Sequence, residues 1–186
     1  MDEDQILAAS VGEPPPTYKE IVLAEYDTEW PQWFAQAADG IRGALGDAVL
    51  QLEHVGSTSV PGLAAKPLID IDLVVADTTA ENAYVPQLEA VGYVFRVREP
   101  DWFEHRMFRG YDPPVNLHVF PPNCEEVERM LAFRDWLRTH DDDRELYART
   151  KRELAAKEWK YVQNYADAKS EVVREILDRA EGNPPK

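Results

Sequence analysis

Hydrophobic residues run together in the middle of the chain and recur at helical spacing on either side of it. Residues 68–75 (LIDIDLVV) are almost continuously apolar except for two aspartates, which predicts a strand covered on both faces and central in a sheet. A short edge strand is expected at 21–25. Further strands are predicted at 48–55, 93–100, 101–111 and 115–120, where aromatic and β-branched residues gather between breakers.

Apolar residues at three- and four-residue spacing predict helices before and after these strands. One is expected to begin within residues 27–31, where a polar capping residue is followed by an acid and Pro31 in the first turn, and to end at Gly46. A second is expected from about Asp77 to Val91, and the last third of the chain is predicted to be helical. This order of elements predicts an α/β (α+β) fold, a twisted mixed sheet with flanking helices and a helical C-terminal third.

The chain has 186 residues, which suits one domain with a sizeable core. Residues 1–20 include the run Gly-Glu-Pro-Pro-Pro and are expected to form a flexible, loosely packed tail. A single domain is predicted over 21–181, followed by a short tail at 182–186. An acidic N-terminus, the lack of a long apolar run and a single cysteine, Cys124, lead us to expect a cytoplasmic protein.

Acidic residues outnumber basic ones by 35 to 20, giving a net charge of −15. Proteins that bind DNA or RNA draw much of their affinity from Lys and Arg on phosphates, so this balance argues against a large nucleic-acid surface. A small nucleotide in a locally basic pocket remains compatible with it.

The two aspartates of the central strand, Asp70 and Asp72, lie two residues apart and therefore point to the same face. Two buried carboxylates need a compensating cation or hydrogen bonds, and oxygen ligands suit Mg²⁺ or Mn²⁺. A Gly-Ser-Thr-Ser turn at 56–59 precedes the strand, where a backbone without Cβ can approach a phosphate. The alternative is that the aspartates form a structural ion pair and the turn binds nothing.

Residues 53–75 (EHVGSTSVPGLAAKPLIDIDLVV) resemble the signature of the GrpB family, and the similarity continues from about Tyr26 through NLHVF and LAFRDWLRTH into the C-terminal helices. The resemblance implies a nucleotidyltransferase-like fold. Members of this family also occur as a domain fused to dephospho-CoA kinase. Many members have an apolar residue where this chain has Asp72. This chain thus keeps the metal-binding aspartate pair of active nucleotidyltransferases.

Polymerase-type nucleotidyltransferases place a third carboxylate on a later strand, and the resemblance puts His118 at that position. A neutral imidazole could ligate a metal or act as a general base, although it could equally be a core histidine. Glu104 is the fallback ligand. Lys66 and Arg106 are the preferred contacts for a triphosphate. Alternatively, Lys66 pairs with an aspartate in place of the metal.

Two lesser expectations concern basic residues. Arg106 and Arg109 are three apart, so strict alternation sends them to opposite faces and only one of them can readily face the site. Arg134 or Lys151 could reach the cleft from the helical part, although exposed helix charge is the commoner role of such residues.

These features together predict a nucleotidyltransferase that uses Mg²⁺ or Mn²⁺ to transfer a nucleoside monophosphate from ATP or another nucleoside triphosphate to a small acceptor. Gly56, Ser57, Thr58 and Ser59 are expected to bind the phosphates, and Asp70, Asp72 and His118 to hold the metal. The alternative is a catalytically silent nucleotide-binding, chaperone or regulatory module, with a functional link to CoA biosynthesis. An adenylating enzyme is a third possibility.

Overall fold

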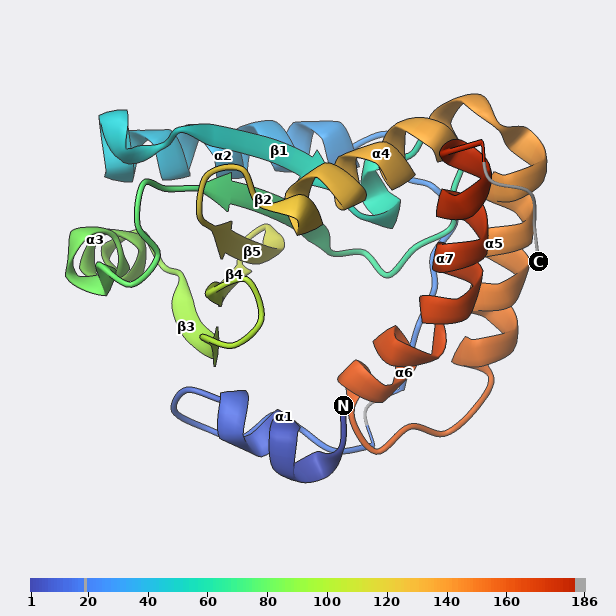
Figure 1. Ribbon diagram of the computed structural model, residues 1–186, viewed down its shortest axis with the longest axis horizontal. Coiled ribbons are helices and arrows are strands. Elements are labelled where there is room, and N and C mark those ends of the chain that lie inside the picture. The colour runs from blue at the N-terminus through green and yellow to red at the C-terminus, as the bar shows by residue number, and fades with distance from the viewer. Residues whose placement is uncertain (19, 183–186) are drawn as a thin grey trace.

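Five strands form one mixed sheet in the computed structural model, which describes residues 1–18 and 20–182 (Figure 1). The strands lie in the order β1-β2-β5-β4-β3. Only β2 and β5 run parallel, and the other neighbours are antiparallel. The strand bounds are β1 (Gln51–Val55), β2 (Ile69–Val74), β3 (Val94–Glu99), β4 (His105–Tyr111) and β5 (Pro114–Phe120). This sheet with its flanking helices confirms the predicted fold class.

The strand β2 lies inside the sheet, between β1 and β5, as its apolar composition predicts. Ile69, Ile71 and Leu73 point to one face and are completely buried. Helices α2 (Trp30–Leu45) and α3 (Val85–Ala90) supply the residues that bury this face, among them Trp30, Ile41 and Leu88. Its opposite face carries the two aspartates, so the core on one side fixes the position of the polar groups on the other.

Four helices form the C-terminal third and lie together on one side of the sheet (Figure 1). They are α4 (Glu125–Thr139), α5 (Asp141–Ala155), α6 (Val162–Ala168) and α7 (Ser170–Ala180). Leu137, Tyr147 and Ile176 from three of them pack on Val60 and Leu63, which belong to the connection between β1 and β2. The helical part is therefore anchored to the segment that leads into the aspartate strand.

Several segments differ from the expectations. Residues 21–25 form only one β-bridge, between Ala24 and Ala65, and residues 101–104 form a loop. The expected helix from Asp77 to Val91 is reduced to the 3₁₀ turn η3 (Glu81–Ala83) and α3, because Pro86 fits only the first turn of a helix.

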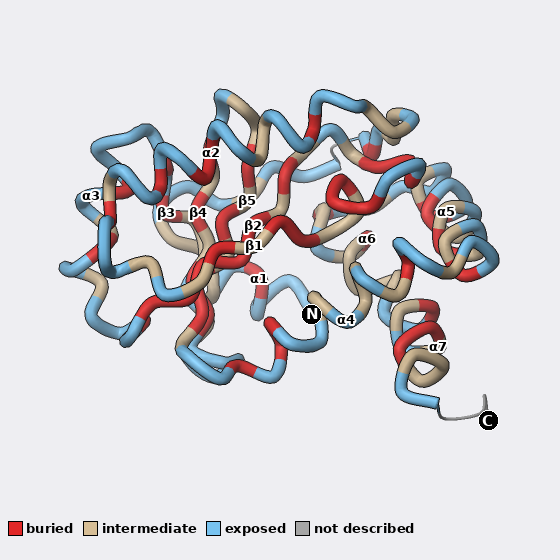
Figure 2. Tube along the Cα trace, turned by 90° about the horizontal axis from the view of Figure 1, so that it is seen from above, coloured by how far each residue is buried: buried red, intermediate tan, exposed pale blue. Residues whose placement is uncertain are grey.

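The N-terminal 18 residues pack more closely than expected. Helix α1 (Glu3–Ala9) begins with a capping box between Asp2 and Gln5 and buries Ile6. Ser10 then pairs with Val97 at the edge of β3. Helix α1 is otherwise mostly exposed, as Figure 2 shows, so Ile6 is the residue through which it packs on the rest of the protein. Of the expected C-terminal tail, residues 183–186 lie outside the described residues.

Within residues 1–18 and 20–182, no helix combines the length and apolar character that crossing a membrane requires.

Candidate functional site

The polar face of the sheet gathers side chains from three strands around the two aspartates. In the parallel pairing of β2 with β5, Asn116 lies beside Asp70 and His118 beside Asp72. On the other side, Glu53 of β1 lies beside Asp72. Alternation along each strand puts these side chains on one face, as predicted for Asp70 and Asp72. Three strands thus contribute ionisable groups to one small area.

Asp72 is buried without any hydrogen-bond partner. Its side chain is 0 % exposed, and neither carboxylate oxygen has a partner among the described residues. Burial, together with the nearby carboxylates of Asp70, Glu126 and Glu53, raises the pKa of Asp72 to about 7, while His118 opposes the shift. An unpaired buried carboxylate is costly, so this position favours a proton or a cation. The donor set fits a bound metal ion.

Asp70 lies in a more polar environment. Asn116 Nδ2 donates a hydrogen bond of 3.0 Å to Asp70 Oδ1, and His118 Nε2 lies 3.9 Å from the same oxygen. Burial on its own raises the pKa of Asp70, but His118, Lys66 and Asn116 outweigh it, so the pKa falls below its ordinary value. The pair therefore combines an ionised carboxylate with one that holds its proton near neutral pH.

A chain of hydrogen bonds connects His118 to the far edge of the sheet. His118 Nδ1 lies 3.0 Å from His105 Nε2, and His105 Nδ1 lies 2.7 Å from Glu99 Oε2. The two imidazoles stack with ring centroids 5.2 Å apart. The residues His105 and Glu99 were missed at the sequence level, because only the register of β4 on β5 brings them to His118.

Asp70, Asp72 and His118 are not arranged as a complete metal-binding site. Among the residues that the structure describes, no group of three or more His, Cys, Asp or Glu is arranged to hold a metal ion. Magnesium commonly takes one or two carboxylates together with waters and substrate phosphates. Asp70 and Asp72 suffice for that mode, and His118 lies on the same face as a further ligand.

The turn before β2 approaches the site through Gly56. Its φ is 68°, and a Cβ built there would lie 2.5 Å from Asp70 Oδ2. Both the backbone angle and the space therefore require glycine. The next residue, Ser57, accepts a hydrogen bond of 2.9 Å from Lys151 Nζ. The turn thus links the aspartate strand to helix α5.

Thr58 and Ser59 are buried and are not brought to the polar face. Thr58 Oγ1 lies 3.0 Å from His54 Nε2 and donates to the Leu68 carbonyl, and Ser59 Oγ donates to the Gly56 carbonyl. Their predicted role as phosphate ligands is corrected, since both hydroxyls stabilise the turn. Gly56 and Ser57 remain candidates for phosphate contact.

Three lysines converge beside the turn, from the loop before β2, from α5 and from the end of α6. Lys66 and Lys169 lie 5.8 and 4.8 Å from the ring centroid of Tyr165, and Lys151 lies 4.7 Å from that of Tyr147. Burial lowers the pKa of Lys151 to about 7, with Lys169 among the neighbouring cations that add to the shift. Such a cluster in a chain of net charge −15 favours an anion.

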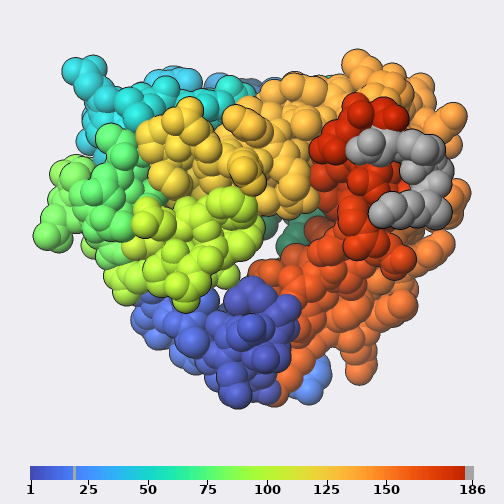
Figure 3. All heavy atoms as spheres, in the orientation of Figure 1, coloured from blue at the N-terminus to red at the C-terminus, as the bar shows by residue number. Residues whose placement is uncertain are grey.

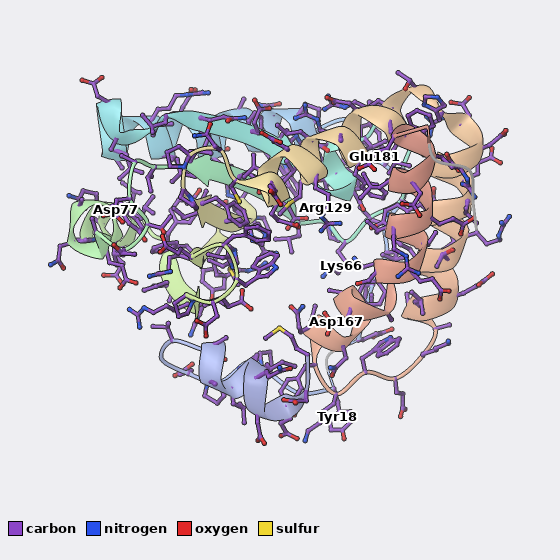
Figure 4. The ribbon with its side chains drawn as sticks, in the orientation of Figure 1. Tyr18, Lys66, Asp77, Arg129, Asp167 and Glu181 are labelled. Atoms are coloured by element: carbon purple, nitrogen blue, oxygen red, sulfur yellow. The ribbon has the colours of Figure 1, made fainter. Side chains whose placement is uncertain are left out.

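Figure 3 shows a hollow in the middle of one face of the molecule, bordered by α4, the β3–β4 region, α1 and the α6–α7 region. Lys66 lies beside this space in the side-chain view (Figure 4). Lys66 thus lies at the edge of this opening.

The arginines are arranged differently from the prediction. Arg106 pairs with Val119 on the apolar face of the sheet, is 4 % exposed, and donates to Glu81 at 2.7 Å and to the Glu104 carbonyl at 2.8 Å. It therefore cannot contact a triphosphate at Asp70. Arg109 takes the polar face and donates to Asn116 Oδ1 at 2.8 Å.

Glu104, Arg134 and Lys151 are the remaining predicted candidates. Glu104 lies exposed in the loop before β4, away from the strand that was expected to present a fallback ligand. Arg134 of α4 donates to Glu53 and to the His54 carbonyl, so it braces β1. Lys151, the other helical candidate, does reach the site; it is 2 % exposed and donates to Ser57 and the Ala64 carbonyl.

Fold comparison finds a nucleotidyltransferase among the solved structures with a similar fold. The structure superposes on Cid1, a poly(U) polymerase, in complex with its short product ApU, with a TM-score of 0.51 and 13% sequence identity. That match covers 68% of this chain and 41% of Cid1, and it shows the fold alone.

The chain belongs to the GrpB protein family, whose model matches residues 20–179. It is 57% identical over 178 residues to UPF0157 protein BH1888 of Halalkalibacterium halodurans, covering 96% of this chain and 91% of that protein. It is also similar to the crystal structure of GrpB from Enterococcus faecalis, with a TM-score of 0.73, 29% identity, and coverage of 86% of this chain and 96% of that one.

Some relatives have a different name and are longer. A dephospho-CoA kinase of Mycolicibacterium paratuberculosis is 29% identical over 184 residues, which cover 85% of this chain and 45% of that protein. The similarity therefore spans less than half of the kinase chain, in agreement with the expected occurrence of this domain in fused proteins.

Proposed function

We propose that this protein is a metal-dependent nucleotidyltransferase that transfers a nucleoside monophosphate from a nucleoside triphosphate to a small acceptor. The observation that carries the proposal is the buried, unpartnered carboxylate of Asp72 next to Asp70. Lys66, Lys151 and Lys169 all interact electrostatically with Asp70. Such a site matches a ligand that brings a cation and a polyphosphate together.

The phosphates are assigned to the Gly-Ser turn and the lysines. The Gly56 backbone approaches closely because no Cβ intervenes, and Ser57 Oγ is oriented by Lys151. Lys66, Lys151 and Lys169 supply positive charge to the oxygens of the polyphosphate. These groups would orient the α-phosphorus towards the carboxylates and keep pyrophosphate in place as the leaving group.

Asp70, Asp72 and His118 are assigned to Mg²⁺ or Mn²⁺. A bound ion of this kind would neutralise phosphate charge and stabilise the attacking and leaving oxygens. The acceptor hydroxyl would attack the α-phosphorus, the bond to pyrophosphate would break, and the proton would pass to water if His118 ligates the metal, or to His118 Nε2 if Asp70 and Asp72 hold the metal without it. The two uses of His118, as ligand and as base, exclude each other because each needs the one lone pair on Nε2.

A small acceptor fits the charge of the chain better than a polynucleotide. Acidic residues exceed basic ones by 15, and the basic residues at the site form one compact cluster. Polynucleotide binding draws on many phosphate contacts along a basic surface. Similarity to a dephospho-CoA kinase relative supports a link to CoA biosynthesis, without identifying the acceptor.

Calorimetric titration tests this function directly. Mn²⁺ and an α,β-nonhydrolysable ATP analogue are titrated into the wild type, into Asp70→Asn, and into Asp39→Asn as a control on the exposed side of α2. The wild type and the control should bind the analogue in the presence of metal, and Asp70→Asn should lose this binding while keeping its unfolding temperature. Equal analogue affinity in all three proteins would refute the assignment.

A silent nucleotide-binding or chaperone-like module is the second candidate. His118 at the position of a third carboxylate favours it, as does the relationship to a longer kinase. A screen of small acceptors for metal-dependent pyrophosphate release separates the two. Nucleotide binding without release for any nucleoside triphosphate would favour the module.

A further inference from the structure

His118 is connected by hydrogen bonds to two residues, His105 and Glu99, that have no role in the proposed reaction. His105, at the start of β4, is 4 % exposed and contacts Phe120 and Trp102, with ring centroids 4.9 and 5.0 Å from its own. Glu99, at the end of β3, accepts a hydrogen bond from His105. Burial and these ring contacts restrict the imidazole, and both of its nitrogens take part in the hydrogen-bond chain.

We propose that Glu99 and His105 are positioning residues that, in the neutral form of His118, keep its Nε2 atom unprotonated and turned towards Asp70 and Asp72. The use of that nitrogen rests on the proposed function, whereas its tautomer does not.

The direction of the chain follows from the donors and acceptors it contains. A carboxylate only accepts, so His105 Nδ1, 2.7 Å from Glu99, carries a hydrogen. In a neutral imidazole only one nitrogen carries a hydrogen, so at alkaline pH the Nε2 atom of His105 is an acceptor. His118 Nδ1, 3.0 Å from it, must then donate. In neutral His118 this leaves the lone pair on Nε2.

Without this chain the neighbouring carboxylate would favour the opposite tautomer. Asp70 Oδ1 lies 3.9 Å from His118 Nε2, and a hydrogen on that nitrogen would be attracted to it. A protonated Nε2 can neither ligate a cation nor accept a proton. Outer hydrogen bonds that fix the tautomer of a metal-binding histidine typically change metal affinity by about 10 to 100-fold.

The test reads the tautomer in the metal-free protein by two-bond ¹H–¹⁵N correlation of the imidazoles at pH 9. In the wild type, His118 should carry its hydrogen on Nδ1. In His105→Phe, which keeps the aromatic packing, the hydrogen should move to Nε2 and Mn²⁺ affinity should fall by about 10 to 100-fold. Glu99→Gln keeps an acceptor and should retain the wild-type tautomer, as should the exposed control Glu104→Gln.

Should His105→Phe fail to fold, Glu99→Leu provides the same comparison. A hydrogen on Nε2 in the wild type, or an unchanged His118 spectrum in both Glu99→Leu and His105→Phe, would overturn the proposal. If the tautomers behave as stated while the wild type binds neither Mn²⁺ nor nucleotide, the positioning role stands and the proposed function fails.

Discussion

The substitution Asp72→Asn should stabilise the metal-free protein at neutral and alkaline pH. Asp72 is buried, lacks hydrogen bonds, and faces His118 on β5, Asp70 on its own strand, Glu53 on β1 and Glu126 on α4. Its folded pKa is about 7, against an ordinary value of 3.8. The folded protein therefore holds this proton over a range in which the unfolded chain releases it.

The sign and size of the effect follow from proton linkage. Because the unfolded state binds fewer protons between pH 3.8 and about 7, the free energy of unfolding falls as pH rises through that interval and levels off above it. Each pH unit is worth about 1.4 kcal/mol, so the full interval corresponds to at most about 4 kcal/mol. Asparagine has nearly the same shape and does not ionise, so the free energy of unfolding of Asp72→Asn does not fall in this way as pH rises.

Urea unfolding with EDTA at pH 5 and pH 8 measures the difference. Asp72→Asn should exceed the wild type by about 2 kcal/mol at pH 5 and by about 4 kcal/mol at pH 8. Saturating Mg²⁺ at pH 8 should stabilise the wild type and leave the variant unchanged. If the variant is less stable than the wild type at pH 8, or if the gap does not grow with pH, then Asp72 is not an uncompensated buried acid.

Three other substitutions test neighbouring parts of the site. Gly56→Ala should destabilise the fold and weaken Mn²⁺ binding in calorimetry, because the added Cβ meets Asp70 Oδ2. The control is Gly43→Ala, which places a Cβ in open space within α2 and should raise the unfolding free energy by about 0.5 to 1 kcal/mol. Lys151→Met should lower nucleotide affinity at least about tenfold. Because the pKa of Lys151 is lowered from 10.5 to about 7, wild-type stability should also rise between those pH values, and the variant should lose this rise in a series of urea unfolding curves. Arg106→Met should cost about 2 to 4 kcal/mol in unfolding free energy and leave nucleotide affinity unchanged; a selective loss of affinity would restore Arg106 to the site.

Sequence patterns predicted the central strand and its two faces because burial on both sides leaves a strong local signal. Asp70 and Asp72 are two residues apart, and period-two alternation alone puts them together. The helix from Trp30 to Leu45 was equally clear, with Pro31 in its first turn and Gly46 at its end. Short helices such as α3 carry too few residues for a periodic pattern, and its prediction was too long.

The choice between Arg106 and Arg109 shows where a usable signal was missed. Tyr111 pairs with Pro114, so only Asp112 and Pro113 connect β4 to β5. A two-residue hairpin connection fixes the register of the whole pair. Counting back from it puts Arg109 opposite Asn116, on the face of Asp70.

The lysines carried no comparable signal. Lys151 and Lys169 approach the turn only because α5 and α6 fold back across the molecule, and neither has a local pattern that distinguishes it from surface charge. Glu99 also has no local pattern that indicates a role in the site, because it is connected to His118 only through His105 of the intervening strand β4.

Both interpretations of Lys66 stay predictions, and the surroundings of Asp70 and Asp72 bear on them. If a lysine replaced the metal as the permanent partner of the aspartates, the more deeply buried carboxylate would be the one most in need of it. Asp72 is that carboxylate, and it accepts no hydrogen bond, while Lys66 acts on Asp70 and lies over Tyr165. The acids therefore favour a cation at the same time as the lysines favour an anion. A bare metal ion or a free phosphate would satisfy only one of these groups, whereas a metal-bound polyphosphate satisfies both at once.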